Sequence, residues 1–133
     1  PDNPMLYYEL GYLYDFQEKY DQALEQYNKA LEVDPDHYES NYNMGVIHVS
    51  KGNKLIHDLN ELSLDEYRKQ EDEYLQRANE EFEQAIPYLE KAAELRPTED
   101  IALLETLEGV YIRLDMEEKA KAMSERVKSI TGQ

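Results

Sequence analysis

The chain contains no cysteine and no tryptophan, and basic residues are scarce: 14 Lys and Arg stand against 30 Asp and Glu in 133 residues. Because cysteine is absent, the chain has neither a disulfide framework nor a thiolate nucleophile. The net charge of −16 would repel a phosphate backbone, so we do not expect nucleic acid as a partner. No run approaches the roughly 18 apolar residues of a membrane span, so we expect no membrane insertion.

The acidic surplus has two interpretations: it keeps the chain in solution, or it attracts a basic partner. Neither composition nor motif assigns a compartment. The sequence shows no signal-peptide pattern, and the absence of cysteine leaves the redox environment open. Cytoplasm and periplasm remain alternatives.

The sequence repeats itself after 34 residues. Gly11 and Gly45 stand that far apart, each directly after a bulky apolar residue. Apolar residues at helical spacing predict one helix over residues 4–17 and a second over residues 20–33. Pro35 ends the second helix, because proline disfavours helical backbone at the residue before it. A 34-residue unit of two helices is typical of a helix-turn-helix solenoid.

Several residue types recur at fixed offsets within this first unit. They are Tyr7, Leu10, Gly11, Tyr14, Tyr20, Ala23, Tyr27, Ala30 and Pro35. With these residues the segment resembles a tetratricopeptide repeat of the bacterial type. The resemblance implies an all-α fold, a TPR-like α-solenoid in which antiparallel helix pairs stack into a right-handed superhelix. It also implies that the chain is a protein-interaction scaffold.

The second unit is longer than the first. Its first-helix signature follows that of the first unit by 34 residues, but its second-helix signature follows by 62, since Tyr27 corresponds to Leu89 and Pro35 to Pro97. The difference is an insertion of 28 residues between the two helices of one repeat. Apolar residues of the return arm alternate steps of three and four, as in a coiled-coil seam: Leu75, Ala78, Phe82, Ala85, Leu89 and Ala92. We therefore expect an elongated middle pair that turns at residues 60–63.

Local signals predict where the later helices begin and where they are strained. Ser63 and Glu66 have the spacing of a capping box, in which each side chain bonds the other's backbone amide. Thr98 is the candidate N-cap of the following helix. Gly52 would lie inside the first long helix at a cost of about 1 kcal/mol. Pro87 lies inside the second long helix and predicts a kink.

We expect one domain of three repeats, at residues 4–37, 38–99 and 100–133. The third repeat departs from the pattern, because the small residue expected after Leu107 is Glu108. Its last helix has a narrow apolar stripe, which suits a terminal capping helix. Residues 1–3 resemble the segment before the second repeat, so we expect the chain to be the C-terminal part of a longer array.

No motif in the sequence points to catalysis, a cofactor or a metal ion. The three histidines, His37, His48 and His57, lack the i, i+4 spacing of a helical metal pair. His48 takes an aromatic position of the repeat, so we expect it to pack in the core. We expect solvated carboxylates along the extension: Glu71, Asp72, Glu73, Glu80, Glu81 and Glu83. The chain is therefore not expected to be an enzyme.

The face of the first helix that packing leaves unused is rich in aromatic residues. In the resembled family this side lines the concave groove, and here the candidate partner-binding residues are Met5, Tyr8, Tyr12, Phe16, Tyr42, Asn43 and Val46. An exposed aromatic stripe is a candidate surface for a protein or peptide partner, which we expect to be apolar or basic. Alternatively, the chain is a secretion or assembly chaperone that shields a hydrophobic client segment. An upstream repeat or the long hairpin could also cover part of this face.

Overall fold

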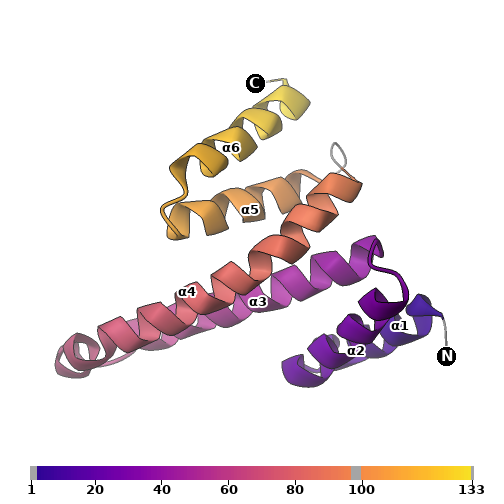
Figure 1. Cartoon of the computed structure of the whole chain (residues 1–133). Coiled ribbons are helices and arrows are strands. Elements are labelled where there is room, and N and C mark those ends of the chain that lie inside the picture. Colours follow the sequence, from indigo (N-terminus) through magenta and orange to yellow (C-terminus); the bar gives the residue numbers. More distant parts are fainter. Residues whose placement is uncertain (1–2, 97–99, 133) are drawn as a thin grey trace.

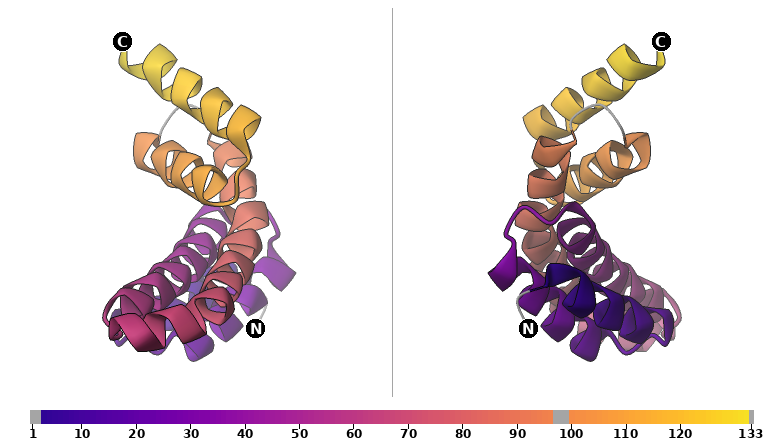
Figure 2. Two further views of the ribbon diagram at one scale, coloured as in Figure 1. Left: turned by 90° about the vertical axis from the view of Figure 1, so that its left-hand side faces the viewer. Right: turned by 90° about the vertical axis from the view of Figure 1, so that its right-hand side faces the viewer.

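The computed structural model describes residues 3–96 and 100–132, and within these ranges the chain forms six α-helices. Their bounds are α1 Pro4–Phe16, α2 Tyr20–Val33, α3 Tyr38–Asn60, α4 Leu64–Leu95, α5 Ile101–Arg113 and α6 Glu117–Thr131. Consecutive helices form three antiparallel pairs, and the two short pairs flank the long α3–α4 pair (Figure 1). Figure 2 shows that the pairs are turned relative to one another along the molecule. The structure confirms the predicted all-α solenoid class.

Side-chain caps define where four of the helices begin. The side chains of Asn3, His37, Ser63 and Asp100 accept hydrogen bonds from first-turn amides of α1, α3, α4 and α5. At Ser63 the bond comes from the Glu66 amide at 3.3 Å, whereas the Glu66 carboxylate accepts from Gln70 instead of completing a capping box. The predicted N-cap Thr98 lies outside the described residues. The observed cap of α5 is Asp100, whose carboxylate accepts from the Leu103 amide at 3.0 Å.

The same tight turn closes the first and third pairs. Glu18 and Asp115 have φ angles of 59° and 57°, and each stands two residues before the second helix of its pair. Left-handed backbone is costly for residues with a Cβ atom. It recurs here because the turn must bring the second helix back against the first within three residues. α2 therefore starts at Tyr20, as the sequence predicts.

The extra length of the middle pair lies entirely in its helices. α3 has 23 residues against 13 in α1, and α4 has 32 against 14 in α2, which together makes 28 additional helical residues. The outer parts of both helices project away from the two short pairs (Figure 1). α4 runs through Pro87 as one helix, and the proline lies on its exposed side. An exposed position leaves room for the ring, although the hydrogen bond to the preceding turn is lost.

Three glycines allow the helices of a pair to approach closely. A Cβ atom would stand 2.7 Å from the Tyr27 ring at Gly11, 2.5 Å from the Leu89 side chain at Gly45, and 2.7 Å from the Phe82 ring at Gly52. Gly52 is thus needed for the close packing of α3 against Phe82. The loss of helix stability expected for a glycine inside a helix accompanies this close contact. Gly45 and Gly52 are seven residues apart, as are Leu89 and Phe82. The antiparallel register is therefore kept from the repeat into the extension.

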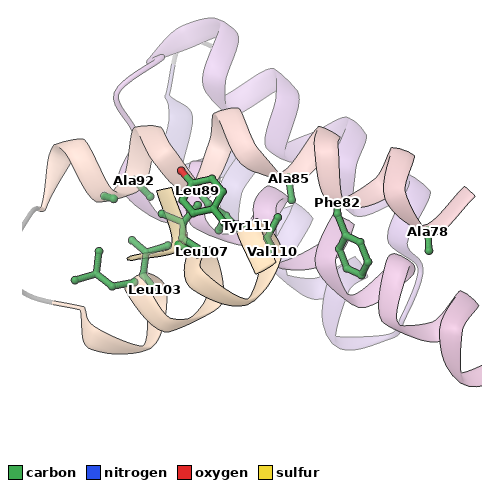
Figure 3. Close-up of a cluster of buried hydrophobic side chains, with 12 residues drawn as sticks. Ala78, Phe82, Ala85, Leu89, Ala92, Leu103, Leu107, Val110 and Tyr111 are labelled. Carbon is green, nitrogen blue, oxygen red and sulfur yellow. The ribbon is translucent and has the colours of Figure 1, made fainter. Parts of the chain in front are cut away.

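Two clusters of buried side chains hold the pairs together. The larger one joins the seam of α4 to α5 and α6, and it includes Ala78, Phe82, Ala85, Leu89 and Ala92 on α4 and Leu103, Leu107, Val110 and Tyr111 on α5 (Figure 3). The smaller one joins α2 to α3 through Ala23, Tyr27, Met44 and Ile47. Leu75 at the outer end of the seam is half-buried. Leu10, one of the signature residues of the first repeat, belongs to neither cluster, and 40% of its surface is exposed.

Candidate partner-binding surface

The seven predicted partner-binding residues fall into an exposed group and a half-buried group. Met5, Tyr12 and Phe16 on α1 are exposed by 44%, 52% and 81%. The half-buried residues are Tyr8 on α1 and Tyr42, Asn43 and Val46 on α3. Only the exposed group offers large apolar side chains to a partner without rearrangement.

Tyr8 connects the exposed surface to the core. Its ring centroid lies 5.8 Å from that of Tyr27, 5.3 Å from His37 and 6.3 Å from Tyr12. Burial raises the pKa of the Tyr8 phenol, and a side-chain hydrogen bond with Asn43 partly offsets this. The sequence interpretation of Tyr8 as surplus to packing is therefore wrong. Tyr8 lies between the buried ring of Tyr27 and the exposed ring of Tyr12.

Asn43 belongs to a hydrogen-bonded chain that crosses three helices. Its amide donates to the Tyr27 hydroxyl at 3.1 Å, and that hydroxyl donates to the Asp15 carboxylate at 3.2 Å. Burial raises the pKa of Tyr27 well above its usual range and raises that of Asp15, where the hydrogen bond from Tyr27 acts in the opposite direction. Asn43 therefore has a structural task between α2 and α3, in addition to any contact with a partner.

Tyr42 packs towards a different part of the molecule. It contacts the α4–α5 cluster, and its ring centroid lies 5.9 Å from that of Tyr38. Tyr38 is itself anchored, because its hydroxyl donates to the Asp100 carboxylate at 2.9 Å and the Arg96 guanidinium lies 4.0 Å from its ring centroid. Tyr42 thus belongs to the junction between the middle and last pairs, whereas the exposed aromatic residues belong to α1.

A shallow hollow follows the surface of α1. It has a volume of about 380 Å³ and is lined by Tyr8, Glu9, Tyr12 and Leu13. The walls are an aromatic pair and a leucine, and Glu9 supplies a negative charge at the rim. This hollow brings together two of the predicted residues, Tyr8 and Tyr12, with two that the sequence interpretation did not include.

A second hollow of about 260 Å³ lies between α3, α4 and α5. It is lined by Val49, Asn53, Phe82, Glu105, Thr106, Gly109, Val110 and Arg113. A Cβ atom at Gly109 would meet no other atom within 4 Å, so the glycine leaves this side open. None of these residues is among the partner-binding candidates predicted from the sequence. They come from three helices, and only the tertiary structure brings them together.

A buried polar cluster between α3 and α4 is structural. His48 is 6% exposed, its Nδ1 lies 3.0 Å from the Glu81 carboxylate, and its ring stacks on Tyr88. Lys51 lies 3.6 Å from the same carboxylate. The prediction that His48 packs in the core is confirmed. The prediction of a solvated Glu81 is wrong, because only 14% of its side chain is exposed and its carboxylate lies close to both His48 Nδ1 and Lys51 Nζ.

Neither a metal site nor a membrane span is found in residues 3–96 and 100–132. No three His, Cys, Asp or Glu side chains there lie close enough to bind one ion. No helix in these ranges is both long and apolar enough to cross a membrane.

The helix pairs match a known family at the level of sequence. Two models of the tetratricopeptide repeat match residues 4–37 and residues 74–99. The first match covers both helices of the first pair, with the close-approach glycine at position 11. The chain is a tetratricopeptide repeat protein. Such repeats generally mediate protein–protein interactions.

A solved structure of a "MamA RS-1 ArsTM double mutant" is similar to this tetratricopeptide repeat protein over 98% of its length and 76% of the other chain. The sequence identity is 19% and the TM-score 0.39, so the similarity carries no argument about the binding surface. No curated protein matches the chain.

Proposed function

We propose that this protein binds an apolar or basic segment of a partner protein on the exposed aromatic side of α1. The observation that supports this most directly is the exposure of Tyr12 and Phe16, at 52% and 81%, beside the hollow between Tyr8 and Leu13. Large aromatic rings without a covering element are typical of interaction surfaces. The ring centroid of Tyr12 lies 6.3 Å from that of Tyr8, so the two rings offer adjoining apolar surface to a partner.

The charges around this surface favour a basic flank on the partner. The chain carries a net charge of −16, and Glu9 lies at the rim of the hollow. Glu39, in the first turn of α3, already pairs with Arg96 at 3.5 Å. The attraction therefore comes from Glu9 and the overall field rather than from a dedicated acidic pocket.

In this proposal the chain is one domain of three repeats, with the middle repeat extended. Tyr12, Phe16 and Met5 provide the contact surface, and Tyr8 and Asn43 hold its floor in place. Tyr42 and Val46 are half-buried on α3, so they contact only a partner segment long enough to extend from α1 to α3.

The test uses fluorescence anisotropy with three labelled 15-residue peptides of matched length, one apolar, one apolar with Lys and Arg, and one apolar with Asp and Glu. We expect the basic peptide to bind best and added salt to weaken it moderately, because salt screens the exposed charges. The double variant Tyr12→Ala with Phe16→Ala should lose binding at least tenfold, since truncated interface aromatics typically cost about 2 kcal/mol or more.

Leu64→Ala is the matched control, because Leu64 is 66% exposed at the far tip of the hairpin. It removes a comparable apolar side chain and should leave binding unchanged. Unchanged binding in the α1 double variant, or a preference for the acidic peptide, would contradict the proposal. If a client protein stays soluble only in the presence of excess chain and is then released, the function is that of a chaperone rather than a stable scaffold.

A further inference from the structure

The extension of the middle pair supplies one wall of the second hollow. A first helix that ended as α1 does would stop at Ser50, 34 positions after Phe16, but α3 continues to Asn60. Asn53, which lines the hollow, therefore lies in the inserted part of the chain. The second hollow thus belongs to the extended repeat of this chain, and it shares no residue with the proposed partner-binding surface on α1.

The floor of the second hollow is apolar. Phe82 on α4 and Val110 on α5 are exposed by 1% and 2%, and Figure 3 shows both side chains in the larger buried cluster. Val49 on α3 is half-buried against the same cluster. A hollow of about 260 Å³ over this floor has room for one large apolar side chain from outside.

Gly109 lies midway between two opposite charges on one face of α5. Glu105 stands four residues before it and Arg113 four residues after it, and all three line the second hollow. Because an α-helix rises 1.5 Å per residue, each charged residue is about 6 Å from the glycine along the helix axis. A Cβ atom at Gly109 would meet no atom within 4 Å, so the space between the two charges is open.

Neither of these charges is neutralised within the part of the chain that the structure describes. The Arg113 guanidinium lies 6.0 Å from the centroid of the Phe82 ring, and it forms no ion pair in residues 3–96 and 100–132. The Glu105 carboxylate likewise forms no ion pair or hydrogen bond there. By contrast, Lys51 and Lys91 both pair with carboxylates. In a chain of net charge −16, an arginine left unpaired is available to a carboxylate from a partner.

The spacing of the glycine and the two charges matches an extended peptide. Side chains two positions apart in an extended chain point to the same side, and their Cα atoms are about 6.7 Å apart. The two steps of about 6 Å along α5 are close to this distance. An apolar side chain above Gly109 would therefore have its neighbours two positions away beside Glu105 and Arg113.

Asn53 favours an extended backbone over a helical one. Its side chain is on the exposed surface of α3 and forms no hydrogen bond with the described residues, so its amide offers both a donor and an acceptor. An extended segment has backbone N–H and C=O groups free to pair with this amide. A helical segment uses these groups internally.

We propose that the second hollow binds an extended segment of a partner protein in which an apolar residue stands between a basic and an acidic residue, each two positions away. The apolar side chain fills the space over Gly109 and lies on Phe82 and Val110. The basic side chain pairs with Glu105, and the acidic side chain pairs with Arg113. This site does not depend on the function proposed above, because the surface on α1 is separate and favours a basic flank.

The test uses two labelled ten-residue peptides of the same composition. The first has lysine, serine, leucine, serine and glutamate in this order at its centre. In the second, lysine and glutamate stand directly beside the leucine and point to the opposite side of an extended chain. Fluorescence anisotropy should show about fivefold tighter binding of the first peptide, since two exposed ion pairs are lost in the second. Equal binding of the two peptides would overturn the proposal.

Gly109→Leu closes the second hollow from α5. It puts an aliphatic side chain where that of the partner would lie, and should weaken binding of the first peptide about tenfold or more. The melting temperature should not fall, because the position is exposed and leucine favours a helix. Ala122→Leu, at an exposed position of α6, is the matched control and should leave binding unchanged. Unchanged binding in Gly109→Leu would contradict the assignment of the hollow.

Glu105→Arg tests the assignment of the charges. With two positive charges beside the hollow, the variant should prefer a peptide in which a second glutamate replaces the lysine, whereas the native protein should prefer the original peptide. An unchanged preference would overturn the assignment. The double variant Tyr12→Ala with Phe16→Ala should still bind the original peptide. Loss of binding in that variant would place the peptide on α1 and overturn the inference, without affecting the function proposed for α1.

Discussion

Gly52 lies directly against the ring of Phe82, so closely that a methyl group on its Cα would stand 2.7 Å from the ring carbon Cε1. Phe82 is 1% exposed, and its ring also lies 6.0 Å from the Arg113 guanidinium. Two ring carbons would lie closer than 3.0 Å to the added methyl group and a third at 3.0 Å, so the ring or one of the helices would have to shift. This contact sets the distance between α3 and α4 where the pair extends beyond the repeat.

Gly52→Ala should lower the free energy of unfolding by about 1–3 kcal/mol, because overpacking outweighs the better helix propensity of alanine. Gly109→Ala is the matched control, since its Cβ would meet no atom within 4 Å. The control should instead stabilise α5 by about 0.5–1 kcal/mol. Urea unfolding followed by circular dichroism measures both. Equal stabilisation by the two variants would show that α3 and α4 are not in close contact at Gly52.

Glu81→Ala should lower the free energy of unfolding by about 1–3 kcal/mol. The variant leaves His48 Nδ1, which lies 3.0 Å from the carboxylate in the native protein, buried without this partner. Glu80→Ala on the same helix removes an exposed carboxylate and should stay within about 0.5 kcal/mol of the native protein. Chemical denaturation compares the two. A loss of similar size in both would mean that the interaction with His48 contributes nothing.

Asp15→Asn should raise the melting temperature at pH 7 by a few degrees, and the gain should shrink below about pH 4. Burial raises the pKa of Asp15 above its unfolded value, with the hydrogen bond from Tyr27 opposing. The folded state therefore binds this proton more tightly, and that advantage is present at low pH and lost as the pH rises through the folded pKa. Asp15→Asn replaces the carboxylate with a neutral amide. It therefore removes the cost of burying a negative charge only at pH values at which the carboxylate is charged.

Glu9→Gln provides the control for net charge, because it removes one negative charge from an exposed position of the same helix. Melting curves at several pH values between 3 and 8 separate the two effects. If Asp15→Asn and Glu9→Gln follow the same pH dependence, burial of Asp15 has no energetic consequence.

The extended hairpin should be stable rather than fluctuating. Amide hydrogen exchange is expected to show protection at Leu59, Leu75 and Ala78, of which Leu59 and Ala78 are exposed by 1% and 0%. Exchange should be faster at residues 61–63, where no helix is formed. Uniformly fast exchange from residue 52 to residue 82 would mean that the hairpin opens independently of the repeats.

Local signals in the sequence were sufficient for the bounds of α2 and for the turn between α3 and α4. α2 runs from Tyr20 to Val33 as predicted, and α3 and α4 turn at residues 61–63 within the expected tip. Helical periodicity, the turn before Tyr20 and the proline after Val33 all act within a few residues. Their effect can therefore be read without knowing what packs on each helix.

The candidate surface was only partly predictable, because exposure depends on neighbours far away in the sequence. Tyr12 and Phe16 are exposed as expected, but Tyr8 is held between Tyr27 and His37. Leu10 shows the opposite case. Its place in the repeat pattern is typical of a buried residue, but 40% of its surface is exposed.

The sequence by itself determined the repeat unit, the all-α class and the 28 extra residues of the middle pair, since spacing and helix propensity are properties of neighbouring residues. The tertiary structure alone decided which side chains close the gaps between helices. Gly52, expected to weaken its helix, lies in close contact with Phe82, and Glu81, expected to be solvated, is a partner of the buried His48. Both outcomes follow from the antiparallel register of α3 and α4. That register is set by the fit of the Phe82 and Leu89 side chains against Gly52 and Gly45, which lie 30 or more residues away in the sequence.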